Sequence, residues 1–250
     1  MNAVLEEEPA IAPPRQKIVR RFVFALLVLL SALIGSFSGL IFVYSTDLPQ
    51  IEQLEHYRPI SSTELYDVHG KVIGSFALQR RVVASYNDFP RVLIDALVST
   101  EDKDFFRHGG VNIWRIVGAA YRDVESAGKV QGASTLTMQL ARNLFLSREK
   151  SYLRKAQELV ITWMLEFWMD KERIFEIYLN VVEWGAGVFG AEAAARHYYG
   201  TSAASLSASQ AARLAVMLPN PRYYDRHRDT NYLARRTNLI VSRMNSADLP

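Results

Sequence analysis

The 250-residue sequence contains no cysteine, which excludes a disulfide-stabilised scaffold and any metal site built from thiolates. Its five histidines show no HExxH spacing, so a zinc site of that type is not expected either. A strong excess of one charge is also missing, because 29 Lys and Arg stand against 26 Asp and Glu, giving a formal net charge of +3. The sequence has no RNA- or DNA-binding motif, and we therefore expect no nucleic-acid partner.

Charged residues are also missing from residues 22–44, a continuous apolar run. As a helix with a rise of about 1.5 Å per residue, this run is long enough to cross a hydrocarbon core about 30 Å thick. A cleaved signal peptide and a buried core helix are the alternatives. Because the apolar run continues through residues 40–44, cleavage is disfavoured and a transmembrane helix is predicted.

The charges on the two sides of the apolar run differ in sign. Basic residues precede it and acidic residues follow it: Arg15, Lys17, Arg20 and Arg21 on one side, Asp47 and Glu52 on the other. Positively charged flanks are retained preferentially on the cytoplasmic side of a membrane. The sequence therefore predicts a cytoplasmic tail at residues 1–21, one transmembrane helix at 22–44 and an extracytoplasmic domain at 45–250.

The extracytoplasmic part is predicted to be mainly α-helical. From Val92 onward, apolar residues recur at spacings of three and four, as in helices with one buried face. Residues 63–76 instead alternate around a His-Gly-Lys turn and predict a small N-terminal β-hairpin. Pro219 and Pro221 predict a loop before the last helix. The apolar side chains of residues 111–128 fit either core packing or a segment that touches the membrane.

A carboxylate continues an apolar stripe in the helix that begins near Val92. Leu93 and Leu97 lie on one face, and Glu101 occupies the next position on that face. Burial disfavours the charged form of a carboxyl group and raises its pKa toward the range in which it exchanges protons near neutral pH. Glu101 is thus either a placed base or an acid at a helix end that points into water, and spacing leaves both open.

A second helix, after Gly132, has one polar face. Thr135, Gln139, Arg142 and Asn143 share that face, opposite a row of leucines. Ser134 is the predicted N-cap, and free amides after it could hold a phosphate. The alternative is a solvated outer face.

Positive charge gathers after this helix, and a second carboxylate follows it. The residues are Arg148, Lys150, Arg154, Lys155 and Glu158. Glu158 lies one turn beyond Arg154, so a simple salt bridge is one interpretation. Two carboxylates and a basic cluster outside a membrane also fit chemistry on a sugar or phosphate-bearing substrate. The periodicity does not decide between hydrolysis and transfer.

These segments resemble the motifs of the family-51 peptidoglycan glycosyltransferases, in particular their monofunctional membrane-anchored members. The motif EDxxFxxHxG is matched in full by Glu101, Asp102, Phe105, His108 and Gly110. GGSTxTQQLxxN appears as GASTLTMQLARN, with Ala133 and Met138 as departures. RKxxE is matched by Arg154, Lys155 and Glu158, and KxxIxxxYLN by Lys171, Ile174, Tyr178, Leu179 and Asn180. RxxxVLxxM is matched loosely by Arg236, Ile240, Val241 and Met244.

The resemblance covers about residues 60–250 and implies a lysozyme-like, two-lobed, mainly α-helical glycosyltransferase domain. Members of this family polymerise lipid II into β-1,4-linked glycan strands, with inversion at C1 of MurNAc and release of undecaprenyl pyrophosphate. The penicillin-binding transpeptidase domain of bifunctional relatives has no counterpart in the sequence, so no transpeptidase activity is expected. The implied location is the bacterial inner membrane, with one membrane pass and the catalytic domain in the periplasm.

The resemblance also assigns roles to residues. Glu101 is the expected general base, and Glu158 the second catalytic carboxylate, which assists the leaving pyrophosphate through a metal or by holding cationic side chains. His108 is expected to support Glu101 or to order its loop, and Tyr178 and Asn180 to lie behind the site. The expected substrate-binding residues are Asp102, Phe105, His108, Ser134, Thr135, Gln139, Arg142, Asn143, Arg148, Arg154 and Lys155.

Any metal at such a site would be Mg²⁺ or Mn²⁺, because these hard ions prefer carboxylate and phosphate oxygens. The sequence leaves the metal ligands unassigned, and no organic cofactor is expected. The expected partners are lipid II, the nascent glycan chain, membrane lipid, and proteins of cell-wall synthesis or division. Two alternatives remain, namely a lysozyme-like lytic transglycosylase and an inactive membrane-anchored cell-wall scaffold.

Overall fold

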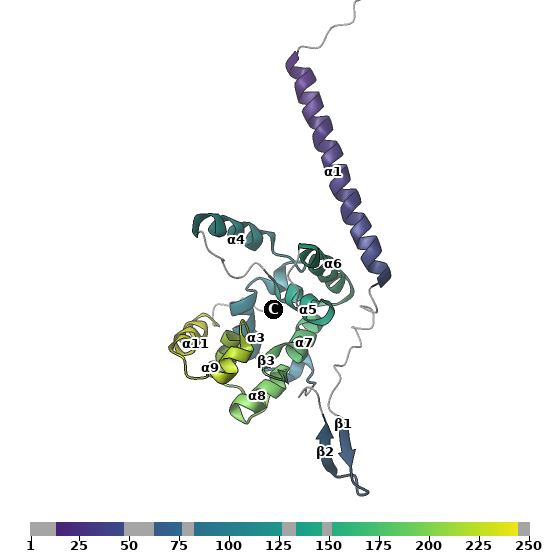
Figure 1. The fold of residues 1–250 in the computed structure, drawn as a ribbon. Coiled ribbons are helices and arrows are strands. Elements are labelled where there is room, and N and C mark those ends of the chain that lie inside the picture. The colour runs from purple at the N-terminus through teal and green to yellow at the C-terminus, as the bar shows by residue number, and fades with distance from the viewer. Residues whose placement is uncertain (1–13, 48–62, 77–82, 127–133, 147–151, 245–250) are drawn as a thin grey trace, which may run out of the picture. The chain divides into compact units, whose positions relative to one another are not determined.

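A computed structural model describes residues 14–47, 63–76, 83–126, 134–146 and 152–244 of the chain. The chain divides into two units, residues 1–49 and 50–250. Figure 1 shows the elements of both.

The first unit is a single long helix, α1 (Pro14–Asp47). Within it, Gln16–Gly39 is long and apolar enough to cross a membrane, and the side chains of this stretch are exposed. The predicted apolar helix is therefore confirmed, and its length and composition fit a membrane anchor. Helix α1 as a whole extends beyond the predicted run of residues 22–44 at both ends.

The second unit begins with a β-hairpin and continues almost entirely as helices, as predicted. Strands β1 (Thr63–Tyr66) and β2 (Val72–Phe76) pair antiparallel, with Thr63 opposite Phe76. The turn closes because the carboxylate of Asp67 accepts the backbone N–H groups of His69 and Lys71, both at 2.8 Å. A second, two-stranded hairpin was not predicted: β3 (Glu183–Gly185) pairs with β4 (Val188–Phe189).

The remaining elements are helices, and their order is as follows: η1 (Tyr86–Asp88), α3 (Arg91–Glu101), η2 (Phe105–Arg107), α4 (Ile113–Ser126), α5 (Leu136–Phe145), α6 (Tyr152–Trp168), α7 (Lys171–Val181), α8 (Ala191–Tyr199), η3 (Ala203–Ser205), α9 (Ala208–Met217), α10 (Pro221–Arg226) and α11 (Asn231–Met244). The loop predicted at Pro219 and Pro221 is wrong in part. Pro221 begins the short helix α10, because proline is tolerated in the first turn of a helix, where its missing N–H is not needed.

The helices pack in two groups. In one group α3 packs on α9 and α11, and in the other α5 packs on α6 and α7 (Figure 1). The core side chains are almost all aliphatic or aromatic, with Leu93, Leu97, Leu136 and Leu140 fully buried. Each fully buried leucine contributes roughly 1.5–3 kcal/mol relative to an exposed one. The two groups approach each other where α3 ends and α5 begins, and the polar residues Glu101, Asp102 and Gln139 lie at that junction.

Helix α4 is an exception to this packing. Ile113, Trp114 and Val117 are exposed, with 85% of Trp114 accessible, so these residues do not form core. Of the two interpretations of this segment, core packing is therefore wrong for them. An exposed apolar face of this kind fits a partner surface such as lipid.

Candidate active site

Glu101 is the last residue of α3 and follows the buried stripe of Leu93 and Leu97, as the spacing predicted. Its Oε2 accepts a hydrogen bond of 2.7 Å from Nε2 of Gln139 on α5. Burial raises the pKa of the Glu101 carboxyl above its ordinary value, although the Gln139 hydrogen bond and the Arg115 guanidinium partly oppose that rise. The structure thus places a carboxyl group with increased proton affinity at the end of an apolar helix face.

Asp102, the next residue, is fully buried and satisfied by three donors. His108 Nε2 donates to it at 3.0 Å, Arg115 at 3.0 Å, and the backbone N–H of Leu136 at 3.1 Å. Because Leu136 is the first residue of α5, the carboxylate also lies at the positive end of that helix. Asp102 therefore joins the end of α3 to the starts of α4 and α5 and fixes the backbone on which Glu101 stands.

Phe105 and His108 complete this support. Phe105 is fully buried, its ring 5.5 Å from that of Phe175, and the ammonium of Lys171 lies 4.5 Å from its ring centroid. The ring of His108 meets the edge of Phe105 while its Nε2 holds Asp102. Neither residue lines the cleft described next, so their expected contact with substrate stays a prediction.

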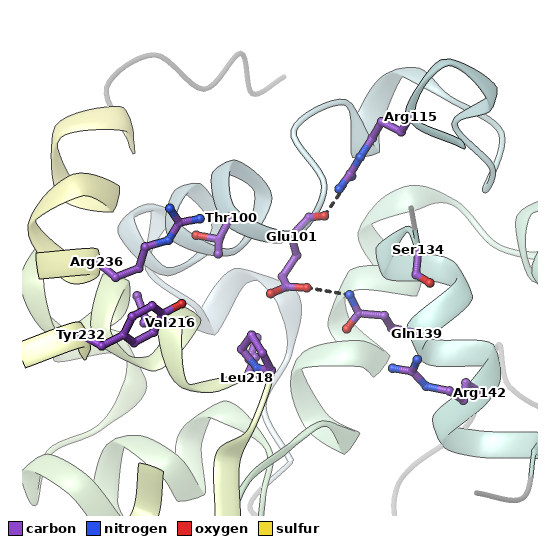
Figure 2. A pocket seen from close by; sticks show the side chains of 11 residues that line it. Thr100, Glu101, Arg115, Ser134, Gln139, Arg142, Val216, Leu218, Tyr232 and Arg236 are labelled. Carbon is purple, nitrogen blue, oxygen red and sulfur yellow. Dashed lines mark hydrogen bonds between the residues drawn. The ribbon is translucent and has the colours of Figure 1, made fainter. Parts of the chain in front are cut away.

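A cleft of about 280 Å³ opens beside Glu101 (Figure 2). Its lining residues come from α3, α4, α5, α9, α11 and the turns around them: Thr100, Glu101, Arg115, Ser134, Gln139, Arg142, Val216, Leu218, Pro219, Tyr232 and Arg236. Four of these were predicted from sequence, namely Glu101, Ser134, Gln139 and Arg142. In Figure 2, Tyr232 and Arg236 lie on one side of Glu101 and Gln139 and Arg142 on the other.

Sequence reasoning missed Arg115, Tyr232 and Arg236 as parts of this cleft. Arg236 belongs to the fifth motif, which could have pointed to it. Nothing in the local sequence marks Arg115 or Tyr232 as a cleft residue, because each lies in a segment with the pattern of an ordinary amphipathic helix. Among the described residues that line the cleft, Glu101 is the only acid and three are arginines. The cleft therefore suits an anionic ligand.

The start of α5 differs from its prediction. Thr135, not Ser134, is the N-cap, and its Oγ1 accepts the N–H of Met138 at 3.2 Å. The hydroxyl of Thr135 also donates to the carbonyl of Gly110 at 2.5 Å. With the N–H of Leu136 held by Asp102, two amides that could have bound a phosphate already have partners inside the protein. Thr135 is fully buried, whereas Ser134 is left to line the cleft.

Glu158 lies on α6, fully buried, between two cations. Its Oε2 accepts from Arg154 at 3.0 Å and its Oε1 from Lys155 at 2.5 Å. The Nζ of Lys155 also reaches Oγ of Ser134 at 3.4 Å, which connects this ion cluster to the cleft. The salt-bridge interpretation of Arg154 and Glu158 is therefore confirmed, and Glu158 itself does not line the cleft.

The ion cluster does not fit a divalent cation. Both oxygens of Glu158 already face a positive charge, which would repel a metal ion. In the part of the chain that the structure describes, no three His, Asp or Glu side chains converge into a metal site.

The other predicted residues are less central. Asn143 is exposed on α5 and does not line the cleft, and Arg148 lies outside the described residues. Met138, which replaces a glutamine of the second motif, is 1% exposed in the core. A glutamine at that inward-facing position would not reach the cleft, so the departure removes no substrate contact there.

Tyr178 and Asn180, on α7, differ in what they support. Tyr178 is fully buried, and its hydroxyl donates to Gln139 at 3.1 Å, so it lies directly behind the cleft. Asn180 instead exchanges hydrogen bonds with the backbone of Ala84, at 2.9 and 2.8 Å. It anchors the segment that enters the helical domain.

A family model described as "Transglycosylase" matches residues 69–245. The chain is similar to the biosynthetic peptidoglycan transglycosylase of Janthinobacterium sp. (strain Marseille), with 65% identity over 66% of this chain and 71% of that one. It is also similar to the protein of the same name from Herminiimonas arsenicoxydans, with 67% identity over 62% of this chain and 67% of that one. Among solved structures, penicillin-binding protein 1A from Haemophilus influenzae matches 75% of this chain and 18% of that one, with 23% identity and a TM-score of 0.38. On the family model and these relatives, the chain belongs to the transglycosylase family and is a glycosyltransferase.

Proposed function

We propose that this glycosyltransferase of peptidoglycan synthesis polymerises lipid II on the periplasmic face of a bacterial inner membrane. The observation that carries the proposal is the placement of Glu101. It is the only acid among the described cleft-lining residues, its carboxyl has a raised pKa, and arginines surround it. A base next to a cationic cleft is what glycosyl transfer from a sugar pyrophosphate requires.

In the proposed reaction, the 4-hydroxyl of the acceptor GlcNAc attacks C1 of the donor MurNAc from the face opposite the pyrophosphate. The C1–oxygen bond to pyrophosphate breaks, and undecaprenyl pyrophosphate leaves with the electron pair. The hydroxyl proton passes to Glu101. Because attack and departure occur on opposite faces, the configuration at C1 inverts and the new linkage is β-1,4.

The cationic side chains stabilise the charge that develops on the leaving pyrophosphate. Arg142 is exposed in the cleft, and Lys155 is connected to it through Ser134. Glu158 holds Arg154 and Lys155 in place by ion pairs. In this role the second carboxylate acts on the cations and transfers no proton.

Lipid-linked substrates require access from the membrane, and two features support it. Helix α1 fits a membrane anchor, with Lys17, Arg20 and Arg21 at its N-terminal end. The exposed apolar face of α4 offers a surface for lipid at the helix that also supplies Arg115. We infer that the N-terminus is cytoplasmic and that α4 touches the outer leaflet.

Orientation can be tested cleanly because the chain has no cysteine. A cysteine at Val68, which is 94% exposed in the β1–β2 turn, should react with a membrane-impermeant maleimide in intact spheroplasts. A cysteine at Ala3 should react only after lysis. The reverse pattern would overturn the assigned orientation.

The activity is tested with purified full-length protein in detergent and lipid II as the only substrate. Wild-type protein should produce glycan polymer, and Glu101→Gln should lower the rate by about 10²–10⁴-fold, the contribution typical of a general base. Glu172→Gln, the same change at an exposed carboxylate on α7, should leave the rate unchanged.

Three other outcomes would contradict the proposal. Full polymerisation by Glu101→Gln would remove Glu101 as the base. Release of soluble fragments from preformed peptidoglycan would identify a lytic enzyme, and retained lipid II binding without turnover by the wild type would identify a scaffold. The same assay with EDTA measures any need for Mg²⁺ or Mn²⁺, and we expect polymerisation to persist because the cations of the cleft are side chains.

A further inference from the structure

A chain of two hydrogen bonds runs from the protein core to the carboxylate of Glu101. It begins at the hydroxyl of Tyr178, which is fully buried on α7 and donates to Oε1 of Gln139 at 3.1 Å. At the other end of the same amide, Nε2 of Gln139 donates to Oε2 of Glu101 at 2.7 Å. Gln139 therefore stands between a core hydroxyl and the cleft carboxylate, bonded to both.

The tyrosine determines which end of the amide faces Glu101. An amide oxygen only accepts and an amide NH₂ only donates, so the two ends are not interchangeable. If the amide were reversed, its oxygen would face the carboxylate, and the buried Tyr178 hydroxyl would lose the acceptor for its hydrogen. Both changes are unfavourable when Glu101 is ionised. The hydroxyl thus stabilises the orientation in which Gln139 donates to the ionised base.

The charged groups around Glu101 act differently from this amide. Arg115 faces it from α4, Arg142 from α5 and Asp102 from the end of its own helix, while Arg236 of α11 lines the same cleft. An anionic substrate that binds the arginines offsets their effect on Glu101. The amide carries no net charge and is held from behind by Tyr178, so it offers an anionic substrate no positive charge to offset.

We propose that Tyr178 is a positioning residue that sets the proton affinity of Glu101 through Gln139. Tyr178 touches no substrate and gives up no proton. Burial and the nearby Glu101 raise the pKa of its phenol well above the usual value, so it stays protonated throughout the working range. The inference rests on the proposed function only in that Glu101 is the base.

The test compares Tyr178→Phe with Tyr198→Phe. Both variants lose one inward-directed hydroxyl, but the hydroxyl of Tyr198 donates to the carbonyl of Trp184 at 2.7 Å and serves no cleft residue. In the pH profile of kcat/KM for lipid II, the acid-side midpoint should rise by about half a unit to one unit in Tyr178→Phe, since a hydrogen bond to the ionised base is weakened. The high-pH plateau should approach that of the wild type, and Tyr198→Phe should keep the wild-type midpoint.

A direct titration separates this inference from the proposed function. Full-length protein in detergent, labelled with ¹³C at the glutamate carboxyls, reports the Glu101 midpoint by NMR, with its signal identified by its loss in Glu101→Gln. The midpoint should rise in Tyr178→Phe and rise further in Gln139→Met, which removes the donor. In the Gln139→Met background, Tyr178→Phe should add nothing.

An unchanged Glu101 midpoint in Tyr178→Phe would overturn the positioning role of Tyr178, whatever the activity and whatever the midpoint in Gln139→Met. Equal shifts with and without Gln139 would also overturn it, because the effect would then bypass the amide. Absence of polymerisation by the wild type would instead overturn the proposed function, while the titration would still decide the role of Tyr178.

Discussion

Glu101 and Glu158 are carboxylates of the same length on neighbouring parts of one domain, yet their surroundings differ. Glu101 borders the cleft, and its side chain accepts from a neutral amide. Glu158 is fully buried and accepts from a guanidinium and an ammonium. A carboxylate paired with cations stabilises a local charge pattern, whereas one that is buried beside a neutral donor has a greater tendency to take up a proton. The difference separates a side chain suited to proton transfer from one suited to holding cations.

The largest energetic effect is expected at the ion cluster. Glu158→Gln keeps the shape of the side chain but removes a fully buried counter-charge from between Arg154 and Lys155, whose own side chains are 18% and 43% exposed. Removing one partner of a buried ion pair is strongly destabilising, and we expect a loss of about 3 kcal/mol in the free energy of unfolding. Urea denaturation of the full chain in detergent, followed by tryptophan fluorescence, measures it.

An exposed ion pair provides the control for this prediction. Asp229, which lies 3.8 Å from Arg213, is fully accessible to solvent, so Asp229→Asn should not measurably change unfolding. If Glu158→Gln were as stable as the wild type, Glu158 would not hold the two cations. Its assigned role, which distinguishes it from Glu101, would then be wrong.

A somewhat smaller loss of stability is expected at Gly110, where the loop after Glu101 packs against the helix that carries Glu158. Gly110 follows the Glu101 loop with φ of +79°, and an added Cβ would lie 2.7 Å from Thr162 and 2.8 Å from Glu166, both on the helix that carries Glu158. A side chain there is strained and has no space, so Gly110→Ala should cost about 2 kcal/mol of stability. It should also lower activity, because the loop that fixes Asp102 must shift.

The neighbouring glycine gives a matched control. A Cβ at Gly109 would meet nothing within 4 Å. Gly109→Ala should therefore leave both the unfolding midpoint and the rate of lipid II polymerisation close to those of the wild type. Equal losses at the two glycines would show that general loop rigidity, and not the contact with α6, is what matters at Gly110.

Local patterns in the sequence were sufficient for one side of the cleft. The row of Leu93, Leu97 and Glu101 predicted the buried face of α3, since helical spacing decides which residues share a face. The spacing left Glu101 open between a base and a solvent-facing acid, and the family motif favoured the base. The polar stripe of α5 likewise predicted Gln139 and Arg142 as cleft residues. Family membership, the mainly α-helical fold and the first hairpin were also predicted and are confirmed.

The opposite side of the cleft could not be predicted in this way. Tyr232 and Arg236 line the same cleft as Glu101 because α11 packs on α9 and α3, which is a long-range arrangement that no local spacing encodes. The same limit applies to Tyr178, whose connection to Gln139 crosses from one helix to another. The N-cap error at Ser134 had a smaller cause. Ser and Thr at successive positions are both favoured caps, and the buried hydrogen bond from Thr135 to Gly110 places Thr135 as the cap although Ser is the better cap by propensity.

The smallest predicted effect is a gain in stability, and it has the opposite sign to that of Glu158→Gln. The folded-state pKa of Glu101 lies above its ordinary value near 4.5, so between these two values the folded protein binds more protons than the unfolded chain. As pH rises through this window, ionisation of Glu101 therefore destabilises the fold. Glu101→Gln removes the ionisation, and should match the wild type near pH 4 but be more stable than the wild type at pH 8. Chemical denaturation at several pH values measures the difference. If the difference in free energy of unfolding between Glu101→Gln and the wild type stayed constant with pH, the pKa of Glu101 would be the same in the folded and unfolded chain. Its assignment as a base whose pKa is raised by burial would then be wrong.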